Sequence, residues 1–147
     1  AKDTIAVRQN RYNTAEKVLS EGNSFLAQDM AGKLLCQKTV AERPDLVEFV
    51  RDMIQRQNVN GIYAALRGMA ERKDRTHLLS DIDVPTLVIT GAEDSVIPVI
   101  ESKRIVKEIP LAYLEIIEDS GHLSNLEQSA PYNKILHKYL ESLSVHA

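Results

Sequence analysis

The sequence has 147 residues, of which 44% are hydrophobic and 27% are charged, and a net charge of −3 at pH 7. This size and composition are typical of one globular domain, which can bury roughly 70% of its unfolded surface without disulfides or metals. The weak negative charge gives no reason to expect nucleic acid or an anionic membrane surface as a partner.

The one cysteine, Cys36, excludes an internal disulfide and fits a reducing compartment, so we expect a cytoplasmic protein. No apolar run approaches the ~18 residues that span a bilayer. Residues 1–5 lack the apolar core of a secretion signal and read like a chain entered in the middle of a helix. We therefore expect no membrane partner, and we expect further chain before the first residue.

Helical periodicity dominates residues 1–80. Apolar residues at helical spacing predict one helix that ends at Gly22-Asn23, a second from Ser24 to about Leu35, a third that opens at Pro44, and a fourth from about Asn60 to Arg72. Proline suits the first position of a helix, which favours the start at Pro44.

From Asp81 onward the spacing of apolar residues is no longer that of one helix after another. The pattern predicts a strand at Thr86–Thr90, a helix at Pro98–Glu108, a strand at Ala112–Glu118 and a helix from Pro131 to about Leu143. This order predicts a right-handed unit with two parallel strands. Parallel sheets are normally larger and covered on both faces, so the first strand is expected to have neighbours outside these residues. Its unpaired edge favours pairing with a missing amino-terminal half or with a second copy of the chain.

Two polar residues follow these strands at equivalent places. Asp94 lies in the turn after the first strand, and His122 lies in the turn after the second. Because parallel neighbours end at one edge of a sheet, about 4.8 Å apart, the carboxylate and the imidazole are expected to meet. Such a pair can serve as the acid and the base of a catalytic triad. Each residue alone has a plainer interpretation, Asp94 as a helix cap and His122 as a packed loop residue.

The sequence VPTLVITGAEDSVIP at residues 84–98, with SGHLSNLEQ at residues 120–128, closely resembles the carboxyl-terminal part of α/β-hydrolases. The resemblance is strongest to small esterases and to hydrolases similar to 3-oxoadipate enol-lactonase. It implies an α/β fold class, here a partial α/β-hydrolase fold. A helical cap at residues 1–80 would precede a parallel βαβα core segment at residues 81–147. It also implies Asp94 as the acid, with Glu93 as the weaker candidate, and His122 as the base.

The nucleophile of that family sits in Gly-x-Ser-x-Gly at a strand-to-helix turn, and this motif is absent from the sequence. The run from Gly22 to Leu26 lacks the second glycine and follows a helix. Ser124 and Glu127 have the spacing of a capping box that would start the last helix. Cys36 lies among apolar residues without a cationic neighbour, as expected for a buried small residue.

The remaining histidines, His77, His137 and His146, form no cluster with the spacing of zinc ligands, and no glycine-rich phosphate loop occurs. We therefore expect neither a metal nor another cofactor.

Three functional hypotheses remain open. In the first, the chain belongs to a serine hydrolase that cleaves a small carboxylic ester or lactone, and it supplies the acid and base but not the nucleophile. In the second, it is a non-catalytic binding or assembly module. In the third, an Asp nucleophile outside these residues makes a dehalogenase. A positioned acid–base pair contributes about 10²–10⁴-fold and enzymes reach at least ~10⁶-fold, so the chain alone is expected to be inactive.

Overall fold

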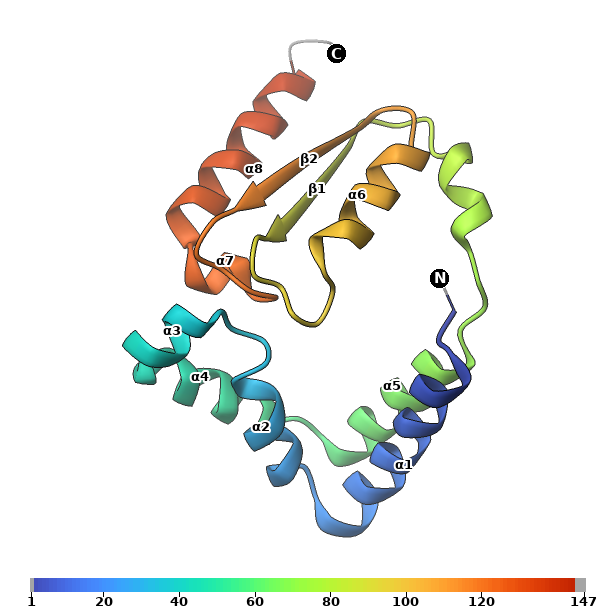
Figure 1. Cartoon of the computed structure of the whole chain (residues 1–147), viewed down its shortest axis with the longest axis vertical. Coiled ribbons are helices and arrows are strands. Elements are labelled where there is room, and N and C mark those ends of the chain that lie inside the picture. The colour runs from blue at the N-terminus through green and yellow to red at the C-terminus, as the bar shows by residue number, and fades with distance from the viewer. Residues whose placement is uncertain (1, 145–147) are drawn as a thin grey trace. The chain divides into compact units, whose positions relative to one another are not determined.

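The computed structural model describes residues 2–144; His146 lies outside the described residues. Figure 1 shows the elements, which are in chain order α1 (Ile5–Glu21), α2 (Ser24–Ala31), α3 (Gln37–Glu42), α4 (Pro44–Gln55), α5 (Val59–Glu71), a 3₁₀ helix η1 (Thr76–Asp81), β1 (Thr86–Gly91), α6 (Val99–Glu108), β2 (Ala112–Ile117), α7 (Ser124–Glu127) and α8 (Ser129–Ser144). The contacts divide the chain into two units. The first comprises Ala1–Ala31 and Glu48–His77, and the second comprises Gly32–Val47 and Leu78–Ala147. The expected division into a cap and a core at residue 80 stays a prediction.

In the first unit α1 packs against α5, and the contact buries Ala15, Val18 and Ala70. The hydroxyl of Thr4 accepts a hydrogen bond from the Val7 N–H, which satisfies one of the free donors at the start of α1. The helix ends at Gly22, whose φ of 77° suits a residue without a Cβ.

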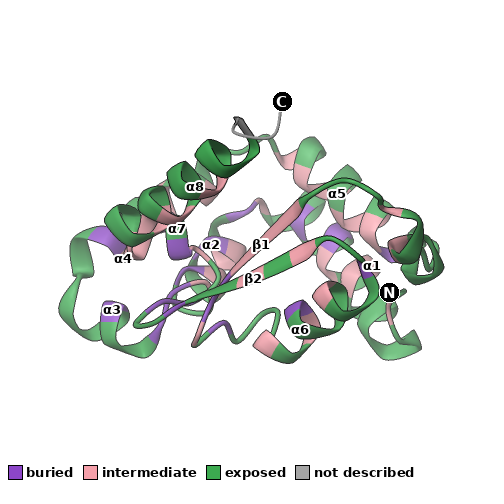
Figure 2. Cartoon of the chain, turned by 90° about the horizontal axis from the view of Figure 1, so that it is seen from above, coloured by how far each residue is buried: buried purple, intermediate pink, exposed green. Residues whose placement is uncertain are grey.

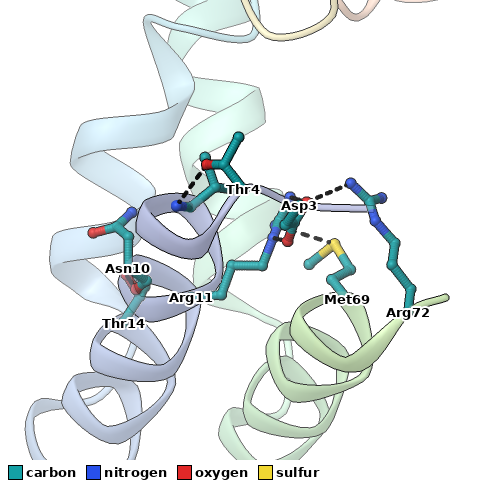
Figure 3. A network of polar contacts seen from close by, with 8 residues as sticks. Asp3, Thr4, Asn10, Arg11, Thr14, Met69 and Arg72 are labelled. Atoms are coloured by element: carbon teal, nitrogen blue, oxygen red, sulfur yellow. Dashed lines mark hydrogen bonds and ion pairs between the residues drawn. The ribbon is translucent and has the colours of Figure 1, made fainter. Parts of the chain in front are cut away.

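An ion-pair network joins the start of α1 to the end of α5. Figure 3 shows the Arg11 and Arg72 side chains converging on Asp3. Their nitrogen atoms lie 2.5 Å and 2.6 Å from the Asp3 carboxylate oxygens. The Asp3 side chain is only 3% exposed. Hydrogen bonds from Arg11, and then from Arg72, hold the pKa of Asp3 below its usual value. The start of α1 is thus tied to the residue that follows α5.

The second unit is built on two parallel strands. The register pairs Thr86 with Ala112 at one end and Gly91 with Ile117 at the other. The connection runs through α6, which contacts both strands, while α8 contacts β2. Figures 1 and 2 show the strands between these two helices. The predicted α/β class and the parallel βαβα order are confirmed.

Burial in this sheet is uneven. The first four residues of β1 are half-buried, whereas Thr90 and Gly91 at its carboxyl end are buried. Most of β2 is half-buried or exposed, as Figure 2 shows, and its only buried residue is Ile117 at the last position. The well-packed part of the sheet is therefore the edge from which the two turns leave.

One predicted helix is wrong. The helix expected from Ser24 to about Leu35 ends at Ala31, and a turn leads to α3, which the periodicity did not reveal. Leu35 and Cys36 are buried in this non-helical segment. The Leu34 carbonyl and the Cys36 N–H bond to residues 123 and 127 instead of continuing a helix. The Cys36 sulfur accepts from the Thr39 N–H at 3.4 Å and caps α3.

Candidate active site

The turns that follow β1 and β2 are bonded to each other through their backbones. The Ala92 N–H donates to the Ile117 carbonyl at 2.8 Å, and the Glu93 N–H donates to the Ser120 carbonyl at 2.9 Å. The Ser120 side chain is fully buried, and its hydroxyl donates to the Ile117 carbonyl at 2.8 Å. The two turns therefore form one connected structure at the carboxyl edge of the sheet.

Two glycines allow this close approach. A Cβ at Gly91 would collide with the carbonyl oxygens of Ser120 and Gly121. A Cβ at Gly121 would lie 2.8 Å from the Leu35 carbonyl carbon and 2.9 Å from the Cys36 nitrogen. Real Cβ atoms do not come this near to backbone atoms, so both positions need a residue without a side chain.

The predicted meeting of Asp94 and His122 is confirmed. Nδ1 of His122 lies 2.8 Å from Oδ2 of Asp94. The other carboxylate oxygen accepts from the N–H groups of Val96 at 2.9 Å and Ile97 at 2.8 Å. Asp94 thus closes its own turn and also binds the imidazole, but it is not the helix cap of its plainer interpretation, because the cap position of α6 is Pro98.

The Asp94 and His122 side chains differ in their exposure to solvent. The Asp94 side chain is 6% exposed, whereas that of His122 is 36% exposed. When the Asp94 carboxylate is ionised it only accepts hydrogen bonds, and the His122 tautomer that donates from Nδ1 then has its lone pair on Nε2. A partly exposed imidazole in this tautomer can accept a proton on Nε2. Glu93, the weaker candidate acid, is exposed, and the ring is bonded to Asp94 instead.

The predicted capping box at Ser124 and Glu127 is wrong. The cap position of α7 is Leu123, which makes no side-chain cap bond, and α7 is a separate turn before α8. The Glu127 carboxylate turns back instead. Its Oε1 accepts from the Gly121 N–H at 2.6 Å, and its Oε2 accepts from the Cys36 N–H at 2.8 Å. The Glu127 carboxylate therefore binds the backbone N–H groups of Gly121 and Cys36, and not the N–H groups at the start of a helix as the capping box predicts.

The loop before His122 has further support. Asp119 has a φ of 52°, a left-handed conformation that Asp tolerates better than most residues. Its carboxylate pairs with Nζ of Lys38 at 2.7 Å, and this hydrogen bond raises the pKa of Lys38. The Gln128 side-chain amide donates to the Asp119 carbonyl at 3.1 Å. The sequence analysis identified none of these contacts.

The other candidate residues occupy structural positions. Cys36 is 1% exposed, and Ser124 is 6% exposed. His137 lies on α8, is 73% exposed, and pairs with Glu141 at 3.4 Å. Among residues 2–144, no group of three His, Cys, Asp or Glu side chains is arranged to hold a metal. Within the same residues, no helix combines the length and apolar character that a membrane crossing requires.

Comparisons with known proteins identify the family of this chain. A family model described as alpha/beta hydrolase fold matches residues 8–129, and the chain belongs to this family. The 3-oxoadipate enol-lactonase 2 of Acinetobacter baylyi is 29% identical over 119 residues, which are 81% of this chain and 44% of the relative.

Solved structures show the same likeness. A thermophilic esterase from Thermogutta terrifontis, solved with malate bound, superimposes with a TM-score of 0.92 at 35% identity. That match covers 96% of this chain and 52% of the esterase. The enol-lactonase of Burkholderia xenovorans, at 23% identity and a TM-score of 0.77, shows the shared fold; the match covers 86% of this chain and 48% of that one. The chain therefore spans about half the length of these relatives.

Proposed function

We propose that this chain supplies the acid and the base of a triad that cleaves a carboxylic ester or lactone. The observation that carries the proposal is the 2.8 Å bond between Asp94 and His122 at the carboxyl edge of a parallel sheet. Ligands of open α/β sheets bind at this edge. The esterase and enol-lactonase named above support the substrate class.

In this mechanism Asp94 holds Nδ1 of His122 and stabilises the imidazolium that forms. Nε2 takes the proton of a serine hydroxyl supplied by chain outside these 147 residues, as the oxygen attacks the substrate carbonyl. The imidazolium then gives that proton to the leaving alkoxide. Water repeats the cycle on the acyl-enzyme, which releases the acid and restores the serine.

We further propose that the free edge of β1 is the surface on which the nucleophile-bearing chain joins. Within the described residues the sheet has the order β1–β2, so one edge of β1 has no strand partner there. Unpaired strand edges offer a row of backbone donors and acceptors to another strand. Gel filtration of the 147-residue chain tests this surface: self-association, or complex formation with an added amino-terminal half, is expected. A folded monomer that does not bind the added amino-terminal half would contradict the proposal.

The catalytic role is tested by His122→Ala in the protein that includes the nucleophile. The expected result is a fall in ester hydrolysis by at least ~10²-fold. His137→Ala is the matched control, since that imidazole is exposed on α8 and should leave the rate unchanged. Near-normal ester hydrolysis by His122→Ala would contradict the assignment of His122 as the catalytic base. Turnover of haloalkanes but not of esters would instead indicate an Asp nucleophile served by the same pair.

A further inference from the structure

Glu127 holds together two segments that are far apart in sequence. Its two carboxylate oxygens accept from two different backbone N–H groups, Gly121 at 2.6 Å and Cys36 at 2.8 Å. Gly121 is the residue immediately before His122. Cys36 ends the turn between α2 and α3.

The other side of His122 is bonded to the same turn. The Leu123 N–H donates to the Leu34 carbonyl at 3.1 Å. The residues on both sides of the imidazole are thus bound, directly or through Glu127, to residues 34–36. Gly121 also packs on the backbone of this segment, with no space for a Cβ.

These contacts fix the main chain, whereas Asp94 fixes only the ring. Gly121 is buried and Cys36 is 1% exposed, so neither N–H can readily exchange its carboxylate partner for water. A hydrogen bond to a carboxylate is also stronger than one to a neutral acceptor.

We infer that Glu127 is a positioning residue for His122. Glu127 holds the backbone of the loop that carries His122, so that Nδ1 of the imidazole meets Asp94. The role needs two acceptors on one side chain. A glutamine has one acceptor oxygen and one NH₂ donor in place of the two carboxylate oxygens, so in the observed arrangement either the Gly121 or the Cys36 N–H would face a donor. The kinetic consequence rests on the triad role proposed above, while the geometric consequence does not.

The test is Glu127→Gln, with Glu108→Gln as the control, because Glu108 is exposed at the end of α6 and carries the same charge. The first readout is the proton resonance of the His122 Nδ1–H in the purified protein, with circular dichroism to verify folding. Glu127→Gln should broaden or abolish this resonance through faster exchange with water, and the control should keep it. An unchanged resonance in folded Glu127→Gln would overturn the inference.

The second readout is ester hydrolysis in the protein that includes the nucleophile. A displaced imidazole should lower kcat by about 10–10²-fold and leave KM unchanged. A loss confined to thermal stability, with the resonance and kcat intact, would contradict a positioning role. If the resonance is lost in Glu127→Gln but the unmodified protein hydrolyses no ester, the positioning role stands and the proposed function fails.

If Glu127→Gln does not fold, amide hydrogen exchange in the unmodified protein tests whether the His122 loop is held in place. The N–H groups of Gly121, Leu123 and Cys36 lie outside regular ladders, yet all three should be protected from exchange. Exchange at the rate of free loop amides would overturn the inference.

Discussion

The two turns at the carboxyl edge of the sheet are packed far more tightly than the face of the same sheet that α8 covers. At the edge, buried backbone atoms leave no room for a Cβ at Gly91 or Gly121. On the α8 side, a cavity of about 520 Å³ is lined by Leu87, Tyr113, Glu115, Lys134, Ile135, Lys138, Tyr139 and Ser142. Tyr113, the second residue of β2 and part of this lining, is 62% exposed.

The difference shows where the geometry of the candidate site comes from. The Asp94 and His122 turns are held by bonds to each other and to residues 34–36. Their geometry therefore does not depend on how well the strands behind them are covered. Changes at the edge should be costly, and changes at the α8 face should be nearly neutral.

The largest effect is expected for Asp94→Asn, measured as kcat in the protein that includes the nucleophile. The amide oxygen can still accept from Val96 and Ile97, but its NH₂ group cannot accept the Nδ1 proton of His122. We expect a loss of about 10³–10⁴-fold, with the fold retained. A variant with more than a tenth of normal activity would show that the carboxylate serves only the turn.

The next effect is expected for Gly91→Ala, measured as the free energy of unfolding in urea. The new methyl group meets two backbone carbonyls that cannot move independently, so we expect a loss of about 3 kcal/mol. Gly68→Ala in α5 is the control, since nothing lies within 4 Å of a Cβ there. That change should stabilise by up to about 1 kcal/mol. Equal effects at both positions would refute the tight packing of the edge.

A change of the opposite sign is expected on the α8 face. The buried Tyr139 hydroxyl has no hydrogen-bond partner among the described residues. Tyr139→Phe removes this unsatisfied group, so the free energy of unfolding should rise by up to about 1 kcal/mol. Thermal denaturation provides the measurement. A clear destabilisation would show that the hydroxyl has a partner, such as an ordered water in the cavity.

The smallest effect concerns the exposed ion pair of Lys38 and Asp119. Because the folded chain raises the pKa of Lys38, the pair stabilises the folded state below the usual lysine pKa. This contribution is lost as the pH rises through the raised value. Lys38→Met should thus lower stability slightly at neutral pH and leave it unchanged in strong alkali. Salt should reduce the difference, because both groups are about half exposed. A difference that persisted in alkali would point to packing instead.

The sequence was sufficient to predict the parts of the site that follow from local pattern. An apolar run before Gly91 predicts β1, and parallel topology then places Asp94 beside His122. Glu127 was misassigned because a Ser-x-x-Glu spacing is compatible with a cap, and only the tertiary fold brings Cys36 near it. The turn at residues 32–36 was missed for a similar reason. Its apolar residues continue a helical period, but their burial against the His122 loop decides the conformation.

The register of the two strands also has a consequence for insertions and deletions. Gly91 pairs with Ile117, and the candidate site residues Asp94 and His122 lie three and five residues beyond that pair. Surface loops normally tolerate changes in length. These two turns do not have that freedom, because one added residue would carry either side chain past the other while the strands stayed in place. In this part of the fold, chain length is as much a determinant of the site as residue identity.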